Sequence, residues 1–264
     1  MASMPENEAN EKENFRDFFI KWKNEQNNQL QDLITASETS NPPLMDSSLC
    51  NLVGRVMGHY EEYYRVKSNR AKTEVLVILS PPWNTPLEDA YLWVGGWRPT
   101  TAFHLLYSKF GLQFEAQLSD LVMSLEAGDL GNLSSGQLER IDKLQRSTIQ
   151  EERDITEKMA KQQERVADME MVELSHDASG STRMDHERVG STLKPKEEGF
   201  RRILQSADNL RMTTLKAVIN ILSPIQAVHF LIAAAELHLR IHNWGKEKEV
   251  SHAGSAYPTT GEAS

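Results

Sequence analysis

The chain has 264 residues and carries 38 acidic side chains against 29 basic ones, which gives a net charge of −9 at pH 7. Such an excess of negative charge disfavours broad nonspecific binding to nucleic acid, because that binding needs a basic surface. The single cysteine, Cys50, excludes an internal disulfide, and the chain has no apolar run of the roughly 18 residues that a membrane span needs. We therefore expect a soluble protein of the nucleus or the cytoplasm.

The N-terminal third predicts two long helices. Residues 1–13 are polar and acidic and are typical of a disordered tail. An amphipathic helix is expected over residues 14–35, where Phe15, Phe18, Phe19 and Trp22 follow the spacing i, i+3, i+4, i+7 and share one face. We interpret that aromatic face as either a packing face or a docking edge for a partner. A second helix is expected over residues 46–79, ended by Ser80-Pro81-Pro82.

Residues 81–100 hold three tryptophans, several prolines and the pair Gly95-Gly96. This composition predicts a short helix over 87–94, a tight glycine turn, and a new helix opening near Pro99 or Thr100. The tryptophans are then anchors at a corner between helices. Further helices are expected over 100–110 and 112–127, followed by a break at residues 128–131.

The second half contains the strongest helical signals. Residues 136–173 form the longest one, and we interpret it as one arm of an antiparallel helical hairpin because polar Thr148 and Gln162 interrupt its heptad positions. Residues 175–198 have no apolar period and predict a mobile loop. Residues 200–244 predict two helices joined at Ser223, where Ser223 and Gln226 fit a capping box.

The last of these helices is apolar on most sides, so it is expected to be a buried C-terminal helix, ending at Trp244 before a Gly245 cap. The predicted fold is all-α. It is a single helical-bundle domain over residues 14–245, with a long helical hairpin and a disordered tail at 246–264.

The sequence contains no catalytic constellation and no recognisable metal-binding motif. The one pair that suggests a cofactor is His238 and His242, which lie one turn apart on the same helix face. Two such imidazoles can bind a metal or ligate a haem iron. The alternative is a pair of histidines whose positive charge is favourable near a helix C-terminus.

Several motifs together resemble the Delay of Germination domain of plants, which also forms the C-terminal part of the TGA-type basic-leucine-zipper (bZIP) transcription factors. The resemblance covers about residues 14–244 in the same order. Its motifs are Trp93-x-Gly95-Gly96-Trp97-Arg98-Pro99, Gln137-Leu138-x-x-Ile141-x-x-Leu144-Gln145-x-x-Thr148-Ile149-x-Glu151-Glu152, Gln163-Glu164-x-Val166-Ala167-Asp168, Ala207-Asp208-x-Leu210-Arg211-x-x-Thr214-Leu215 and Leu222-Ser223-Pro224-x-Gln226-Ala227.

The resemblance implies an all-helical domain without catalysis. The first 40 residues hold eight acidic and four basic residues and no basic zipper helix, so a stand-alone member of the family is expected. Such members are linked to seed dormancy and abscisic-acid signalling, bind clade A type-2C protein phosphatases, and include haem binders. The alternative is a regulator of DNA-templated transcription with sequence-specific DNA binding, acting directly or through a TGA-type bZIP partner.

The resemblance also assigns residues. Asp17, Phe19, Ile20 and Trp22 match the family's partner-binding segment, although Lys21 stands where that segment has an acidic residue. His238 and His242 match the spacing of the proposed haem histidines.

Overall fold

The computed structural model describes residues 15–38, 46–111, 133–177 and 183–255, and every regular element within them is a helix. The all-α prediction is confirmed. The described helices include one over residues 101–111 and a single 3-10 turn at Arg165–Ala167. The other helices are α1 Phe15–Glu38, α2 Asp46–Leu79, α3 Pro86–Ala90, α5 Ser135–Glu164, α6 Met169–Asp177, α7 Arg183–Ile221 and α8 Pro224–Ser255.

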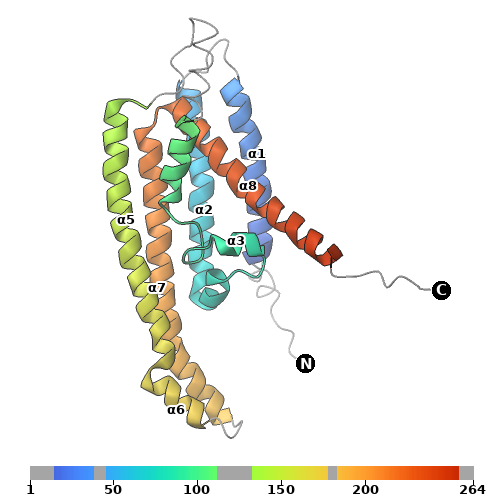
Figure 1. The fold of residues 1–264 in the computed structure, drawn as a ribbon, viewed down its shortest axis with the longest axis vertical. Helices are drawn as coiled ribbons and strands as arrows, with labels where there is room; N and C mark the ends of the chain where they lie inside the picture. The colour runs from blue at the N-terminus through green and yellow to red at the C-terminus, as the bar shows by residue number, and fades with distance from the viewer. Residues whose placement is uncertain (1–14, 39–45, 112–132, 178–182, 256–264) are drawn as a thin grey trace, which may run out of the picture.

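The helices form a bundle with a projecting arm (Figure 1). α5 and α7 run antiparallel along each other, and α6 lies at the far end of this pair. The predicted hairpin is therefore present. α1 and α2 lie on the other side of α7, and α8 crosses them with α3 against its C-terminal half. None of the described helices is both long enough and apolar enough to cross a membrane.

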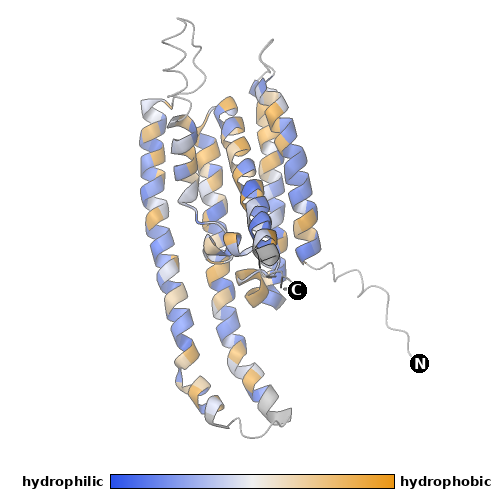
Figure 2. Ribbon diagram, turned by 45° about the vertical axis from the view of Figure 1, so that its right-hand side comes forward, coloured by the Kyte–Doolittle hydropathy of each residue, from blue (hydrophilic) through white to orange (hydrophobic). Residues whose placement is uncertain are grey.

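The main core lies where α8 meets α2, α7 and the helix over 101–111. Val228, Phe230 and Leu231 of α8 are almost fully buried there, together with Phe103 and Leu106. The expected burial of the last helix is thus observed for its first half. Figure 2 shows hydrophobic residues recurring along each helix between hydrophilic ones, the pattern of helices that bury one face each.

Capping boxes begin α3, α5 and α8, the first formed by Thr85 and Glu88. Ser134 and Gln137 cap α5. Ser223 donates its backbone N–H to Gln226 Oε1 at 2.9 Å before α8, as predicted. The Gln137 amide also donates to the Ile221 carbonyl at 2.9 Å, so the start of α5 is fastened to the joint between α7 and α8.

The predicted end of the last helix is wrong, because α8 continues through Gly245 to Ser255. A Cβ atom at Gly245 would lie 2.0 Å from the Thr85 hydroxyl oxygen. The glycine therefore allows α3 to approach α8 closely and does not cap the helix. Residues 246–255 are accordingly helix and not tail, and the rest of the predicted tails, 1–13 and 256–264, lies outside the described residues.

The predicted loop at 175–198 is also wrong for the residues described, since α6 extends to Asp177 and α7 begins at Arg183 and passes through Pro195. Tertiary contacts supply what the local sequence lacks. Gln162 donates to the Lys196 carbonyl at 2.8 Å, and the buried Lys196 ammonium pairs with Asp168.

Smaller boundaries also differ. The signal over 136–173 breaks at Arg165–Ala167, and the short helix covers 86–90 instead of 87–94. The helix expected over 112–127 and the break at 128–131 lie outside the described residues.

Candidate functional site

The chain makes a tight turn between α3 and the helix over 101–111. The Trp93 amide donates to the Gly96 carbonyl at 2.8 Å, and Val94 and Gly95 adopt left-handed φ angles of 44° and 66°. A Cβ atom at Gly95 would lie 2.8 Å from the Ile78 carbonyl oxygen. Glycine is required here for both reasons, because its φ is positive and α2 is close. The predicted glycine turn is confirmed.

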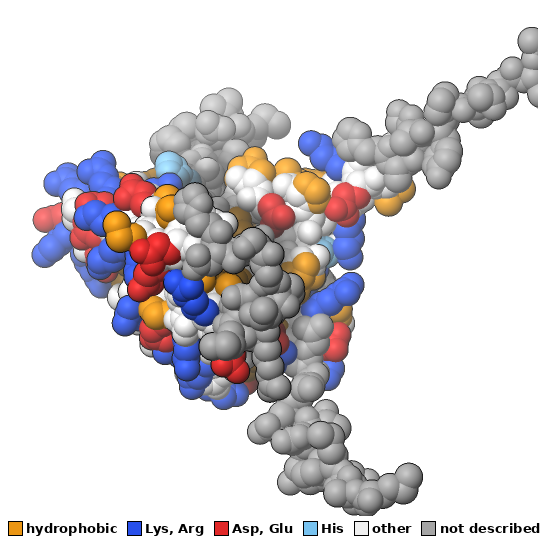
Figure 3. All heavy atoms as spheres, turned by 90° about the horizontal axis from the view of Figure 1, so that it is seen from below, with side chains coloured by type: hydrophobic (Ala, Val, Ile, Leu, Met, Phe, Trp, Pro, Cys, Tyr) orange, Lys and Arg blue, Asp and Glu red, His pale blue; other side chains and the backbone are white. Residues whose placement is uncertain are grey.

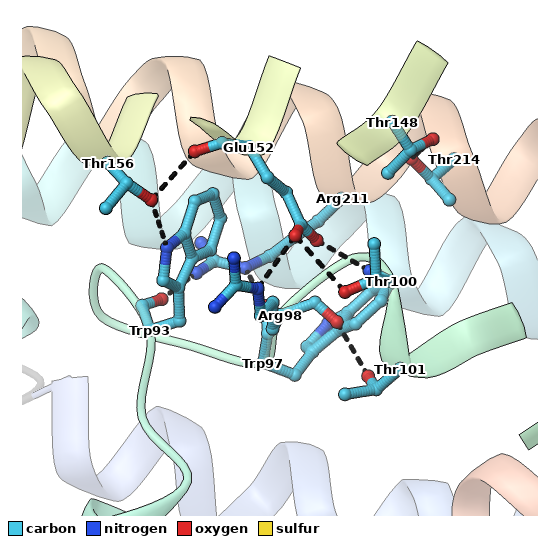
Figure 4. Close-up of polar contacts among 10 residues, drawn as sticks. All are labelled: Trp93, Trp97, Arg98, Thr100, Thr101, Thr148, Glu152, Thr156, Arg211 and Thr214. Carbon is cyan, nitrogen blue, oxygen red and sulfur yellow. Dashed lines mark hydrogen bonds and ion pairs between the residues drawn. The ribbon is translucent and has the colours of Figure 1, made fainter. Parts of the chain in front are cut away.

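A buried arginine from α7 fills this turn (Figure 4). Arg211 is 0% exposed. It donates from Nε to the Trp97 carbonyl at 2.6 Å and from Nη2 to the carbonyls of Val94, at 3.0 Å, and Trp93. Its Nη1 pairs with Asp208 one turn earlier on α7. The guanidinium thereby satisfies three backbone carbonyls that the turn leaves without helical partners.

Lys67 of α2 completes this group, which we call the polar node: Lys67, Asp208, Arg211 and the carbonyls of residues 93–97. The Lys67 ammonium donates to Asp208 Oδ1 at 2.7 Å and to the Gly95 carbonyl at 2.8 Å. Burial lowers the pKa of Lys67 to about 8, against the attraction of Asp208. Lys67 is therefore protonated at pH 7, and the node holds two cations around one carboxylate.

A second buried carboxylate ties α5 to the same turn. Glu152 is 1% exposed and accepts from Arg98 Nε at 2.7 Å and from the Thr100 backbone N–H at 2.6 Å. Glu152, on α5, thus accepts a hydrogen bond from an N–H group at the start of the helix over 101–111 that has no partner within that helix. Next to it, Trp93 donates its indole N–H to the Thr156 hydroxyl at 3.1 Å (Figure 4).

The polar node and Glu152 have a structural role. Each charged side chain of the node and each oxygen of Glu152 is engaged by another protein group, so no base or nucleophile is presented to a substrate. Among the described residues, no three His, Cys, Asp or Glu side chains gather in a way that could hold a metal ion. The node instead joins α2, α7 and the turn, and Glu152 adds α5.

The predicted histidine pair lies elsewhere, where α8 packs against α1 and α3. His238 Nδ1 is 2.7 Å from Gln26 Oε1, and its ring contacts Phe19 and Trp22 at centroid distances of 6.3 and 5.9 Å. Burial lowers the pKa of His238 to about 4. His238 is therefore neutral at pH 7 and belongs to the packing of α1 on α8.

His242 is 6% exposed and has Nδ1 3.0 Å from each carboxylate oxygen of Glu88. Burial lowers the pKa of His242, and the hydrogen bond to Glu88 acts in the opposite direction. A carboxylate on one imidazole nitrogen is a common way to orient a metal-ligating histidine. For haem, the fit is restricted by the neighbouring helices, because Gln26, Phe19 and Trp22 of α1 lie against His238 and Glu88 of α3 lies against His242.

The N-terminal segment divides into two sides. Phe15, Phe19 and Trp22 are buried, and Trp22 donates its indole N–H to the His59 carbonyl at 3.1 Å and stacks on the His59 ring at 4.8 Å. The aromatic face is therefore packed against α2 and α8 in this structure, and a partner-binding role for Phe19 and Trp22 stays a prediction. Asp17 and Ile20 are exposed, Ile20 by 47%. Only these two of the four predicted partner-binding residues lie on the surface.

Comparisons with known proteins agree with the family resemblance that the sequence motifs indicate. The family model for DOG1, described as seed dormancy control, matches residues 29–108. Protein DOG1-like 3 of Arabidopsis thaliana is 31% identical over 244 residues, which cover 89% of this chain and 85% of that protein. The chain belongs to the DOG1-like family. Transcription factor TGA2 of the same plant is 31% identical over 224 residues, covering 84% of this chain and 60% of that factor.

The residues by which the sequence resembles the DOG1-like family are largely those that build the turn and the polar node. Trp93, Gly95, Trp97 and Arg98 form or flank the turn, and Arg211 fills it. In this DOG1-like protein the motif thus specifies how four segments are joined.

Sequence reasoning missed Lys67, Gln26 and the role of Glu152. Lys67 carried a usable signal, because it follows Tyr60 and Tyr64 on the apolar face of α2, where a charged residue implies a buried partner. Gln26 carried none, since its partner His238 is 212 residues away.

Proposed function

We propose that this DOG1-like protein is a non-enzymatic regulator that acts by docking other proteins, in the control of seed dormancy. The observation that carries the proposal is the structural use of the family motif. The charged side chains of the motif bond to other groups of the protein, in the polar node and around Glu152. Specific contacts with a partner would therefore be made by other residues, on the surface of the bundle. Relatives named DOG1-like and relatives named as transcription factors both match most of this chain, and the matching family model is described as seed dormancy control, which fits a shared helical docking scaffold.

The proposed partner class is the clade A type-2C protein phosphatases, with α1 providing part of the contact. Because Phe19 and Trp22 are packed inside, the contact would be made by the outward side chains of the segment, Asp17 and Ile20. An exposed isoleucine beside a carboxylate offers an apolar anchor and one directional polar contact.

A binding assay tests this with the full chain and a purified phosphatase of that class. The Asp17→Ala/Ile20→Ala variant should bind at least about tenfold more weakly, as expected when an anchor worth ~1.4 kcal/mol is lost. The matched control is Asn24→Ala/Gln31→Ala, which removes two exposed polar side chains further along α1. Equal binding by both variants would place the contact elsewhere, and no binding by the parent protein would remove this partner class.

The alternative is regulation of transcription through a TGA-type bZIP partner, in the nucleus. It is favoured by the similarity to TGA2 and TGA5, each of which aligns with 84% of this chain. Direct DNA binding is disfavoured by the net charge of −9. Filter binding of fragmented genomic DNA at low salt, with and without a TGA factor, separates the cases. Capture of this chain on the DNA only when the factor is present supports partnership, and saturable submicromolar DNA binding by this chain alone supports direct readout.

Haem binding by His238 and His242 stays a proposal, and the packing sets its condition. Gln26 and Glu88 engage the Nδ1 atoms of His238 and His242, so a haem iron would have to be ligated through an Nε2 atom. A haem titration tests it. A Soret band that disappears in His238→Ala/His242→Ala supports the proposal, and an equal band in both proteins contradicts it.

A further inference from the structure

An open groove of about 400 Å³ runs between α5 and α7, near the end of the arm. Each wall consists of four residues at the helical spacing i, i+3, i+4, i+7. One wall, from the end of α5 and the turn after it, is formed by Lys158, Lys161, Gln162 and Arg165. The opposite wall, on α7, is formed by Gly199, Arg202, Ile203 and Ser206. We call this the basic groove.

The charge of the basic groove is of one sign. Its lining holds the four cations Lys158, Lys161, Arg165 and Arg202 and no carboxylate. Lys161 pairs with Glu157 at 2.7 Å, and Arg165 lies 3.9 Å from Asp168. Among the described side chains, no carboxylate lies within ion-pair distance of Lys158 or Arg202. Figure 3 shows Lys and Arg side chains at the left edge, the side on which α5 lies in Figure 1, with Asp and Glu side chains among them.

This concentration of positive charge is unexpected in a chain of net charge −9. Lys161 and Arg165 each have a carboxylate beside them, whereas the charges of Lys158 and Arg202 are balanced by no described carboxylate within ion-pair distance. Like charges on adjacent helix turns repel one another. The cations are nevertheless placed around one hollow. A bound anion would remove the repulsion, so the arrangement is suited to a ligand of opposite charge.

The floor of the groove is fixed. A Cβ atom at Gly199 would lie 2.4 Å from Gln162 Oε1, so the glycine lets the two helices meet closely. Gln162 is buried and donates to the Lys196 carbonyl at 2.8 Å. The backbones that carry the cations are therefore held at a set spacing, which lowers the entropic cost of closing them around a ligand.

We infer that the basic groove binds a phosphate group, in the form of a phosphate ester or pyrophosphate dianion. An arginine guanidinium group can donate two parallel hydrogen bonds to two oxygens of one phosphate, and a lysine ammonium group adds a compact positive charge. A phosphorylated serine carries a charge of about −1.5 to −2, enough to engage several of these cations at once. The phosphate can belong to a phosphorylated segment of a protein or to a small soluble compound. This inference does not rest on the docking function, which stands or falls separately.

The experiment is a calorimetric titration of the full chain with two probes, sodium pyrophosphate and a phosphoserine peptide, the unphosphorylated peptide serving as a blank. The Lys158→Gln/Arg202→Gln variant should bind at least about tenfold more weakly than the parent. Lys158→Arg/Arg202→Lys keeps both charges and should bind within about threefold. The matched control, Lys143→Gln/Arg153→Gln, removes two exposed cations of α5 outside the groove and should bind as the parent does.

The two probes distinguish the sources. Pyrophosphate binding that depends on the groove, with no peptide binding, supports a small soluble ligand, and groove-dependent peptide binding supports a phosphorylated protein segment. The inference is overturned if neither probe binds at 50 mM salt, or if the groove variant and the control lose affinity equally. In the second case the attraction is general electrostatics, which salt would screen at every site alike.

Discussion

Replacing Trp22 tests whether the aromatic face of α1 holds the fold together. Trp22 is 5% exposed, lies 4.8 Å from the rings of both His59 and Tyr63, and donates one hydrogen bond to the His59 carbonyl. Trp22→Ala should therefore lower the free energy of unfolding by about 3–5 kcal/mol, the usual cost of removing a buried aromatic side chain. That is a large share of the roughly 5–15 kcal/mol that stabilises a typical domain.

Two further variants divide this cost. Trp22→Phe keeps most of the ring packing and loses the indole donor, so it should lose about 1–2 kcal/mol. Ile20→Ala, on the exposed side of the same helix, should lose about 1 kcal/mol or less. Urea unfolding followed by circular dichroism at 222 nm measures all three. The reasoning is refuted if Trp22→Ala changes stability by less than about 1 kcal/mol and instead abolishes partner binding, the behaviour of a docking edge.

Three other predictions concern the node, the close approach of α3 and the histidines. Arg211→Met should lower the free energy of unfolding by about 3–5 kcal/mol, because it removes the donor of buried turn carbonyls and one of the two cations beside Asp208. Arg55→Met, at an exposed ion pair, should change it by no more than about 1 kcal/mol in the same urea assay. Gly245→Ala should lower the melting temperature, because the added methyl group would clash with Thr85. Gly58→Ala should raise it, because Gly58 lies within α2 with free space around it and alanine favours the helix. An increase for both variants would show that the packing of α3 does not require Gly245. The half-buried His238 has a folded pKa of about 4 and an unfolded pKa of about 6.5, so the unfolded state binds more protons between these values. Stability should therefore fall as pH drops from about 6.5 to 4. His238→Gln should flatten this slope, and an unchanged slope would contradict the lowered pKa.

Local patterns determined much of this protein. Helical periodicity identified α1, α2, α5 and α8, and the Ser223 capping box placed the joint before α8, because both signals depend on residues within one or two turns of each other. The Gly95-Gly96 pair located the turn for the same reason. These features follow from the sequence because the groups that satisfy one another are neighbours in it.

Partners far apart in the chain were decided only by the tertiary structure. Lys67 and Asp208 are 141 residues apart, and the sequence around either residue does not indicate that the other is its partner. Gly245 has the local signal of a helix cap, but the approach of Thr85 assigns it to close packing, and α8 runs on. Residues 183–198 lack a helical pattern and are helical because Gln162 and Asp168 fasten Lys196 from α5 and the turn after it. Local sequence sets which segments form helices, whereas burial and long-range hydrogen bonds decide which face of each is covered and where it ends.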